Sequence, residues 1–160
     1  MNENKELKFQ KLKICILTIS SSRELSDDKS GDVLEERILG FGHELFERKI
    51  TKDNKDSIKN IIINWSKDKE IDVIITSGGT GLTETDVTPE ALEEIFEKTI
   101  PGFSVIFHNI SFNKIKTSTI QSRATAGILM ETFIFALPGS PSAVKAVSYT
   151  HLTLPTTRCV

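Results

Sequence analysis

The sequence predicts an α/β domain in three layers, α/β/α, with a mostly parallel β-sheet between two layers of helices. Short apolar runs of strand length alternate along the chain with segments of helical periodicity, a pattern typical of parallel sheets covered on both faces. The length of 160 residues is near that of one domain, and the 38% hydrophobic and 26% charged fractions are typical of globular proteins. We therefore predict a single domain over residues 1–147.

The N-terminal half is predicted to contain two strand–helix units. A β-branched apolar run indicates the first strand, and an apolar stripe from Ile58 to Trp65 at spacings of three and four residues indicates the second helix. The predicted elements are a frayed start (1–11), a buried strand (12–19), a polar loop (20–31), a helix (31–40) stopped at Gly40 and Gly42, a second strand (44–50) and a helix (54–66).

The C-terminal half is predicted to continue the alternation. Thr88 is expected to be a helix N-cap, with Pro89 at the first helical position and Glu90 near the positive end of the helix dipole. The predicted elements are a strand (73–76), a glycine-rich break (77–81), the helix after Thr88, a turn (101–102), an amphipathic segment not assigned to helix or strand (103–112), one or two strands (124–130 and 132–136), a break (138–141) and a helix from Ser142. Helical periodicity stops after Val147, so we expect residues 148–160 to be a non-native or irregular tail.

Composition excludes several classes of function. The formal net charge of −2 argues against a general nucleic-acid binder, because such domains usually carry a basic excess. Cys15 and Cys159 give neither a disulfide framework nor metal-ligand spacing. No stretch is long and apolar enough for a signal peptide or a membrane span, so we expect a cytoplasmic protein without membrane contact.

The strongest local signal for a ligand is the glycine-rich break after the third strand. Gly78, Gly79 and Gly81 let backbone N–H groups face an anion at the carboxyl end of a strand, and Ser77 and Thr80 add hydroxyl donors. A following helix N-terminus adds a positive dipole end. A tight turn that needs positive φ is the alternative, and the strand–loop–helix context favours phosphate binding over it.

Two aspartates are candidate Mg²⁺ ligands. Asp86 lies between the glycine-rich loop and the next helix, where a carboxylate can hold Mg²⁺ together with substrate phosphates. A solvated or helix-capping role is an equal alternative for Asp86 on position alone. Asp53 follows the second strand and can approach the same crevice, although in isolation it is more typical of a cap for the 54–66 helix.

Two further segments are candidate ligand contacts. Ser122 and Arg123 precede a strand and offer a charge for a phosphate or a planar group, against the alternative of a surface arginine. The turn at Pro138, Gly139 and Ser140 can present N–H groups to a second anion, or can be a plain strand-to-helix connection. The three histidines form no metal or catalytic-triad pattern; they are His43, His108 and His151.

Seven motifs, taken in order, resemble one known family. The chain is similar to the MogA/MoaB family of molybdenum cofactor biosynthesis, which includes the G domain of gephyrin, from about residue 12 to residue 146. The motifs are Asp28-Lys29-Ser30-Gly31, Gly42-His43, Thr76-Ser77-Gly78-Gly79-Thr80-Gly81, Asp86-Val87-Thr88-Pro89-Glu90-Ala91, Pro101-Gly102-Phe103, Ser122-Arg123-Ala124 and Leu137-Pro138-Gly139-Ser140-Pro141.

The resemblance implies an enzyme, a molybdopterin adenylyltransferase. It implies a MogA/MoaB-like fold, commonly a homotrimer, that transfers AMP from Mg-ATP to the terminal phosphate of molybdopterin and releases pyrophosphate. Asp53 and Asp86 match the family's two essential aspartates and are the implied catalytic and Mg²⁺-binding residues. The glycine-rich loop with Ser30 and Gly31 is implied to orient phosphates, Ser122 and Ser140 to line the pterin side, and a downstream molybdate-insertion enzyme to be a partner.

Departures from the family pattern keep two other functions open. Ser104, Val105 and His108 stand where relatives usually read Gly-Glu and, shortly after, Arg. This difference favours, as an alternative, a non-catalytic member that binds molybdopterin or acts as a scaffold. A nucleotide hydrolase of the CinA type ranks third, because residues 18–22 lack the Gly-Asp-Glu signature of that family.

Overall fold

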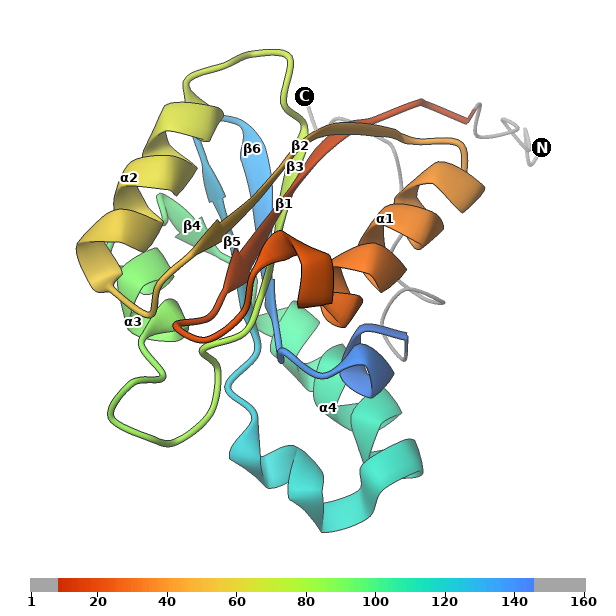
Figure 1. Ribbon diagram of the computed structural model, residues 1–160, viewed down its shortest axis with the longest axis vertical. Coiled ribbons are helices and arrows are strands. Elements are labelled where there is room, and N and C mark those ends of the chain that lie inside the picture. The colour runs from red at the N-terminus through yellow and green to blue at the C-terminus, as the bar shows by residue number, and fades with distance from the viewer. Residues whose placement is uncertain (1–8, 146–160) are drawn as a thin grey trace, which may run out of the picture.

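A single six-stranded sheet lies between two layers of helices. The computed structural model describes residues 9–145, and its sheet has the strand order β2-β1-β3-β6-β5-β4 (Figure 1). The strands are β1 Lys13–Ile19, β2 Glu44–Thr51, β3 Val73–Ser77, β4 Lys98–Thr99, β5 Thr125–Leu129 and β6 Thr132–Leu137. The helices are α1 Lys29–Gly40, α2 Lys55–Ser66, α3 Thr88–Glu93 and α4 Pro101–Ile115, with 3-10 turns η1 Leu25–Asp27 and η2 Lys116–Gln121.

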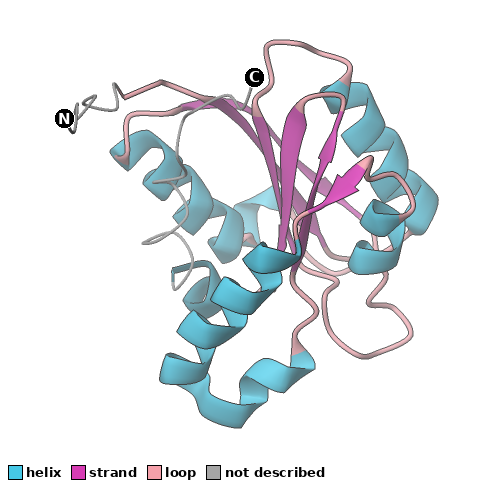
Figure 2. Ribbon diagram, turned by 180° about the vertical axis from the view of Figure 1, so that it is seen from behind, coloured by secondary structure: helices cyan, strands magenta, loops and turns pink. Residues whose placement is uncertain are grey.

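The alternation of side chains along β1 divides the core into two clusters. Ile14 and Ile16 pack on one face with apolar residues of α1 and α4. Cys15 and Leu17 pack on the other face with residues of α2 and α3. Figure 1 and the reverse view in Figure 2 show helices on both sides of the strands. The predicted three-layer α/β fold is therefore confirmed.

The four strands β2, β1, β3 and β6 run parallel. Their carboxyl ends meet at one edge of the sheet. In the sheet, β2 lies on one side of β1 and β3 lies on the other side. The strand order therefore changes direction between β1 and β3. Ligands of doubly wound sheets bind at such a switch point, outside the carboxyl ends of the strands.

An antiparallel hairpin completes the other half of the sheet. β5 is antiparallel to β6, and the two-residue β4 is antiparallel to β5. The region predicted as one or two strands is therefore two strands, joined by a turn in which Met130 and Glu131 have φ of 48° and 71°. The edge strand β4 was not predicted, because two residues carry no periodicity.

Several predicted helix boundaries are shifted. Val87, not Thr88, is the N-cap of α3, and the Thr88 hydroxyl instead donates to the Gly78 carbonyl at 2.9 Å. The turn predicted at 101–102 is the first turn of α4, because the fixed φ of proline suits a first helical position. The amphipathic segment 103–112, which the sequence did not assign to helix or strand, belongs to this same helix.

The first helix also begins earlier than predicted. Asp28 is the N-cap of α1, with its side chain accepting from the Gly31 N–H, so Ser30 and Gly31 lie in the first helical turn rather than in a loop. The predicted helix from Ser142 matches helical backbone over residues 141–145. The predicted tail, 148–160, lies outside the described residues. Within residues 9–145, no helix combines the length and apolarity needed to cross a membrane.

Candidate functional site

The glycine-rich loop after β3 requires its glycines for steric reasons. Gly78 and Gly79 have φ of +110° and +67°, a region that side chains rarely adopt. A Cβ on Gly78 would lie 2.2 Å from the Ile19 carbonyl oxygen, and one on Gly79 would lie 2.3 Å from Thr88 Oγ1. The tight-turn interpretation is therefore correct for these two residues. The turn also lets the loop pass close to the end of β1, where a ligand site is expected.

Loops from four parallel strands surround one cavity of about 500 Å³. Residues 20–23 follow β1, Asp53 follows β2, residues 78–81 follow β3 and residues 138–140 follow β6. The far wall consists of α4 and the segment after it. Ten predicted site residues line this cavity: Asp53, Gly78, Gly79, Thr80, Gly81, Asp86, Ser122, Pro138, Gly139 and Ser140.

Asp86 is held as an ionised carboxylate. Its Oδ2 accepts hydrogen bonds from the Thr83 N–H at 2.9 Å and the Thr83 hydroxyl at 2.6 Å. Partial burial pushes the pKa of Asp86 upward, but hydrogen bonds from Thr83 and the Gly81 backbone outweigh burial and leave the pKa below its ordinary value. Asp86 is not a helix cap, because Val87 occupies that position.

Asp53 reaches the same cavity from the adjacent side. Its Oδ2 accepts from the Ser21 hydroxyl at 2.7 Å, and its N–H donates to Ser21 Oγ at 3.3 Å. The capping interpretation of Asp53 is wrong, because the Asn54 side chain caps α2 by accepting from the Ser57 N–H. The fold thus brings two carboxylates from different strand ends to one cavity.

These carboxylates fit Mg²⁺ as a partial ligand set. Among residues 9–145, no group of three or more histidines, cysteines or acidic residues is arranged to hold a metal by itself. Mg²⁺ is usually held by one or two carboxylates, with water and substrate phosphates completing its octahedron. Asp53 and Asp86 provide hard oxygen donors of that kind beside a loop suited to phosphate.

Arg123 supports the loop that carries Asp86. Its Nε donates to the Gly81 carbonyl at 2.8 Å, its Nη2 donates to the Asp86 carbonyl at 2.7 Å, and its Nη1 pairs with Glu90. The hydrogen bond from Arg123 lowers the pKa of Glu90. The guanidinium therefore joins both ends of the 81–86 loop to α3, and Arg123 does not line the cavity.

Three predicted residues lie behind the cavity wall. The Ser30 hydroxyl donates to the Gly139 carbonyl at 2.7 Å. The Gly31 N–H donates to Asp28 at 3.1 Å, and a Cβ on Gly31 would lie 2.1 Å from Asp28 Oδ2. Ser77 is fully buried. Ser30 and Gly31 therefore shape the loops, whereas Ser77 ends β3 and its hydroxyl has no partner among the described residues.

Buried hydroxyl groups mark a part of the cavity in which the sequence predicted Ser122 but neither Ser111 nor Thr119. Ser111 Oγ, Thr119 Oγ1 and Ser122 Oγ are buried and have no hydrogen-bond partner among the described residues. All three residues line the cavity beside Phe107 and Ile115. Buried polar groups are usually satisfied, so these unpaired hydroxyls make this wall of the cavity a candidate for contact with a ligand. A stretch rich in Ser and Thr after α4 was the available signal.

His108 lies just outside the cavity and contacts its wall. Nε2 of His108 is 2.9 Å from the Ser122 carbonyl oxygen, and Nδ1 is 2.6 Å from the Ser104 carbonyl oxygen. The ring therefore connects α4 to the segment that carries Ser122. Val105 is 61% exposed, and neither it nor His108 lines the cavity.

Comparisons with known proteins agree on one family. Residues 15–157 match the family described as "Probable molybdopterin binding domain". The chain is 41% identical over 137 residues to molybdenum cofactor biosynthesis protein B of Escherichia coli (strain K12), covering 86% of this chain and 81% of that protein. It is 37% identical to the "Probable molybdopterin adenylyltransferase" of Methanocaldococcus jannaschii, covering 86% of each. A crystal structure of molybdenum cofactor biosynthesis protein B matches with a TM-score of 0.85 and 37% identity, covering 91% of each chain.

Proposed function

The chain belongs to the molybdopterin-binding family of molybdenum cofactor biosynthesis proteins, and we propose that it is a molybdopterin adenylyltransferase. The observation that carries the proposal is the meeting of Asp53, Asp86 and the glycine-rich loop at one cavity. In the proposed reaction, AMP passes from ATP to the terminal phosphate of molybdopterin. A relative that shares 37% of its residues bears the name of this activity.

The proposed chemistry is one in-line displacement at phosphorus. A phosphate oxygen of molybdopterin attacks the α-phosphorus of ATP, and the bond from that phosphorus to the pyrophosphate oxygen breaks. The attacking oxygen is already an anion, so the reaction needs no general base. Most of the rate then comes from positioning and from stabilisation of charge. Pyrophosphate carries away the electron pair of the broken bond.

Each part of the cavity has a role in this proposal. The loop of Gly78, Gly79, Thr80 and Gly81 orients phosphate oxygens, and the 138–140 turn supports a second phosphate. The orphaned hydroxyls of Ser111, Thr119 and Ser122 lie where a pterin ring can form hydrogen bonds. Ser30, Gly31 and Arg123 contribute by holding the loops in place.

Asp53 and Asp86 are the residues proposed to hold Mg²⁺. Bound there, the ion would supply neutralisation of the triphosphate charge. The hydrogen bonds that lower the pKa of Asp86 favour its ionised form, which is the state that binds a cation. Ser21 fixes the orientation of Asp53 through its hydroxyl.

The proposal extends to the setting of the protein. We propose a homotrimer in the cytoplasm that passes adenylylated molybdopterin to a molybdate-insertion enzyme. The family resemblance supports this arrangement. The replacements at Val105 and His108 lie outside the cavity lining, which supports a catalytic member over one that only binds molybdopterin.

Pyrophosphate release from Mg-ATP tests the activity. Release should require molybdopterin, and Asp86→Asn should lower the rate about 100-fold or more, because charge stabilisation by a metal site is worth several kcal/mol. Asp56→Asn is the matched control, since Asp56 is 84% exposed on α2 and outside the cavity.

Other outcomes would refute the proposal in distinct ways. Release that does not depend on molybdopterin would identify a nucleotide hydrolase. Molybdopterin binding without any release would identify a binding protein. Equal rates in Asp86→Asn and Asp56→Asn would remove Asp86 from the site.

A further inference from the structure

The charge of the cavity raises the question of which residue receives a phosphate. Asp53 and Asp86 both line the cavity and are both anionic. Among the described residues of the lining, the single cationic side chain is Arg23, in the loop after β1. We propose that Arg23 is the phosphate-binding cation of this site. The inference rests on the proposed function only in its choice of ligand.

The other arginines beside the site are neutralised by acidic partners. Arg123 pairs with Glu90. Arg48 pairs with the buried Asp28 at 3.0 Å and also with Asp32 and Glu35. Arg23, in contrast, forms no ion pair with any residue in 9–145. Its positive charge therefore remains available to a ligand.

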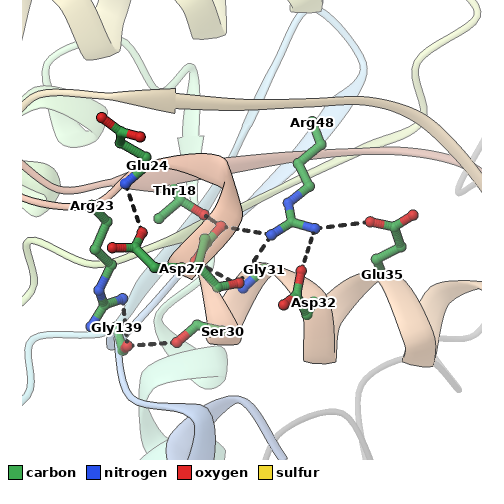
Figure 3. A network of polar contacts seen from close by, with 11 residues as sticks. Thr18, Arg23, Glu24, Asp27, Ser30, Gly31, Asp32, Glu35, Arg48 and Gly139 are labelled. Atoms are coloured by element: carbon green, nitrogen blue, oxygen red, sulfur yellow. Dashed lines mark hydrogen bonds and ion pairs between the residues drawn. The ribbon is translucent and has the colours of Figure 1, made fainter.

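The Arg23 guanidinium is positioned and still has donors to offer. Its Nη1 donates to the Gly139 carbonyl at 3.2 Å, and no other hydrogen bond from the guanidinium to a described residue is present. Figure 3 shows the side chain directed to Gly139 beside Ser30. A guanidinium has five N–H donors in a planar fork that matches a phosphate, so most of the fork can serve a ligand.

The backbone that carries Arg23 is fixed by local hydrogen bonds. The Arg23 N–H donates to Ser20 Oγ at 3.2 Å. The next residue, Glu24, donates its N–H to Asp27 at 2.7 Å and closes a capping box at η1. These bonds fix the backbone at Arg23, and the hydrogen bond to Gly139 connects its side chain to the turn after β6.

Binding measured by calorimetry, with Mg²⁺ removed by EDTA, tests the inference. The probes are ATP, inorganic pyrophosphate and molybdopterin. Arg23→Ala should weaken binding of a phosphate-bearing probe about 10- to 100-fold, the range expected for losing a charged hydrogen-bonded pair. Arg23→Lys should recover part of the loss, because lysine keeps the charge without the fork.

The pattern among the probes identifies the source of the phosphate. Weaker binding of ATP and pyrophosphate alone assigns Arg23 to the nucleotide, and weaker binding of molybdopterin alone assigns it to the pterin phosphate. Either pattern supports the inference. If the wild type binds phosphates through Arg23 but releases no pyrophosphate from ATP, the proposed function fails and the inference stands.

Two control variants define the result that would overturn the inference. Lys29→Ala removes the same charge from an exposed position outside the cavity lining. Ser30→Ala removes the other hydrogen bond to the Gly139 carbonyl without changing charge. An equal loss of affinity in Arg23→Ala and either control would overturn the inference, as would unchanged affinity for all three probes or no binding by the wild type.

Discussion

Replacement of Asp28 tests how strongly a buried polar network stabilises the fold. Asp28 is fully buried, and its Oδ2 accepts from the Thr18 hydroxyl at 2.6 Å and from Arg48 at 3.0 Å. Its Oδ1 accepts from the Gly31 N–H at 3.1 Å as the N-cap of α1. Figure 3 shows Thr18, Gly31 and Arg48 gathered in this network. One carboxylate thus joins β1, α1 and β2.

The magnitude follows from what Asp28→Ala leaves without a partner. Breaking a buried ion pair costs about 3–5 kcal/mol, and losing a helix cap costs about 1 kcal/mol. These costs overlap, and Arg48 keeps Asp32 and Glu35, so we expect a total of about 3 kcal/mol. Asp32→Ala breaks a second pair of Arg48, but the Asp32 side chain is 63% exposed. Such an exposed pair is worth about 0–1 kcal/mol, so Asp32→Ala is the matched control.

Urea unfolding followed by the fluorescence of the single tryptophan, Trp65, measures both variants. Trp65 is 5% exposed, so its emission reports on the core cluster to which α2 contributes. With a slope of about 1–3 kcal/mol per molar urea, the midpoint of Asp28→Ala should fall by roughly 1–3 M. A free energy of unfolding within about 1 kcal/mol of that of Asp32→Ala would refute the reasoning, because the buried network would then contribute no more than an exposed pair.

Two further perturbations probe the loop after β3 and the central strand. Arg123→Lys keeps the charge but breaks the paired hydrogen bonds to the Gly81 and Asp86 carbonyls. We expect kcat to fall about tenfold and the Mg²⁺ concentration required to rise, while molybdopterin affinity stays within about twofold. An equal loss of molybdopterin affinity would contradict a role of Arg123 in supporting the Asp86 loop. Burial raises the pKa of the Cys15 thiol from 9.0 to about 12, so its stabilising contribution is complete below pH 9 and is lost as the pH rises from 9 toward 12. Relative to Cys15→Ala, the wild type should lose up to about 1.4 kcal/mol per pH unit in unfolding experiments above pH 9, and parallel curves would count against it.

The parts of the fold that were predicted from sequence are those with a local physical cause. The strands β1 and β3 are short apolar runs buried on both faces, and such runs are typical of the centre of a parallel sheet. The glycine-rich break at Gly78 and Gly79 was predicted from its position after a buried strand. The close approach of Ile19 and Thr88 explains why no side chain fits there. Features local in the sequence therefore allowed both the core strands and the loop to be predicted.

The parts that were missed lack such a local signal. The turn at Met130 and Glu131 adopts positive φ without the Gly, Asn or Asp residues that usually mark a hairpin. α4 has apolar residues on its buried side, such as Phe107, and on its exposed side, such as Val105 and Ile106, so its periodicity did not identify a helix. Arg23 was overlooked because the 20–31 stretch was assigned only as a polar loop. Its role depends on Gly139, which is 116 positions away.

The antiparallel direction of β5, which the sequence did not predict, explains how the candidate site is completed. In a fully parallel sheet, the amino end of each strand lies at the edge opposite to the ligand. Because β5 runs against β6, Thr125 at the start of β5 pairs with Ala136 near the end of β6. The residues just before β5, Ser122 and Arg123, therefore enter at the same edge as the loops after β1, β3 and β6. The reversal of one strand brings both the hydroxyl-lined wall and the support of the Asp86 loop to the cavity, where a parallel strand would have carried them away from it.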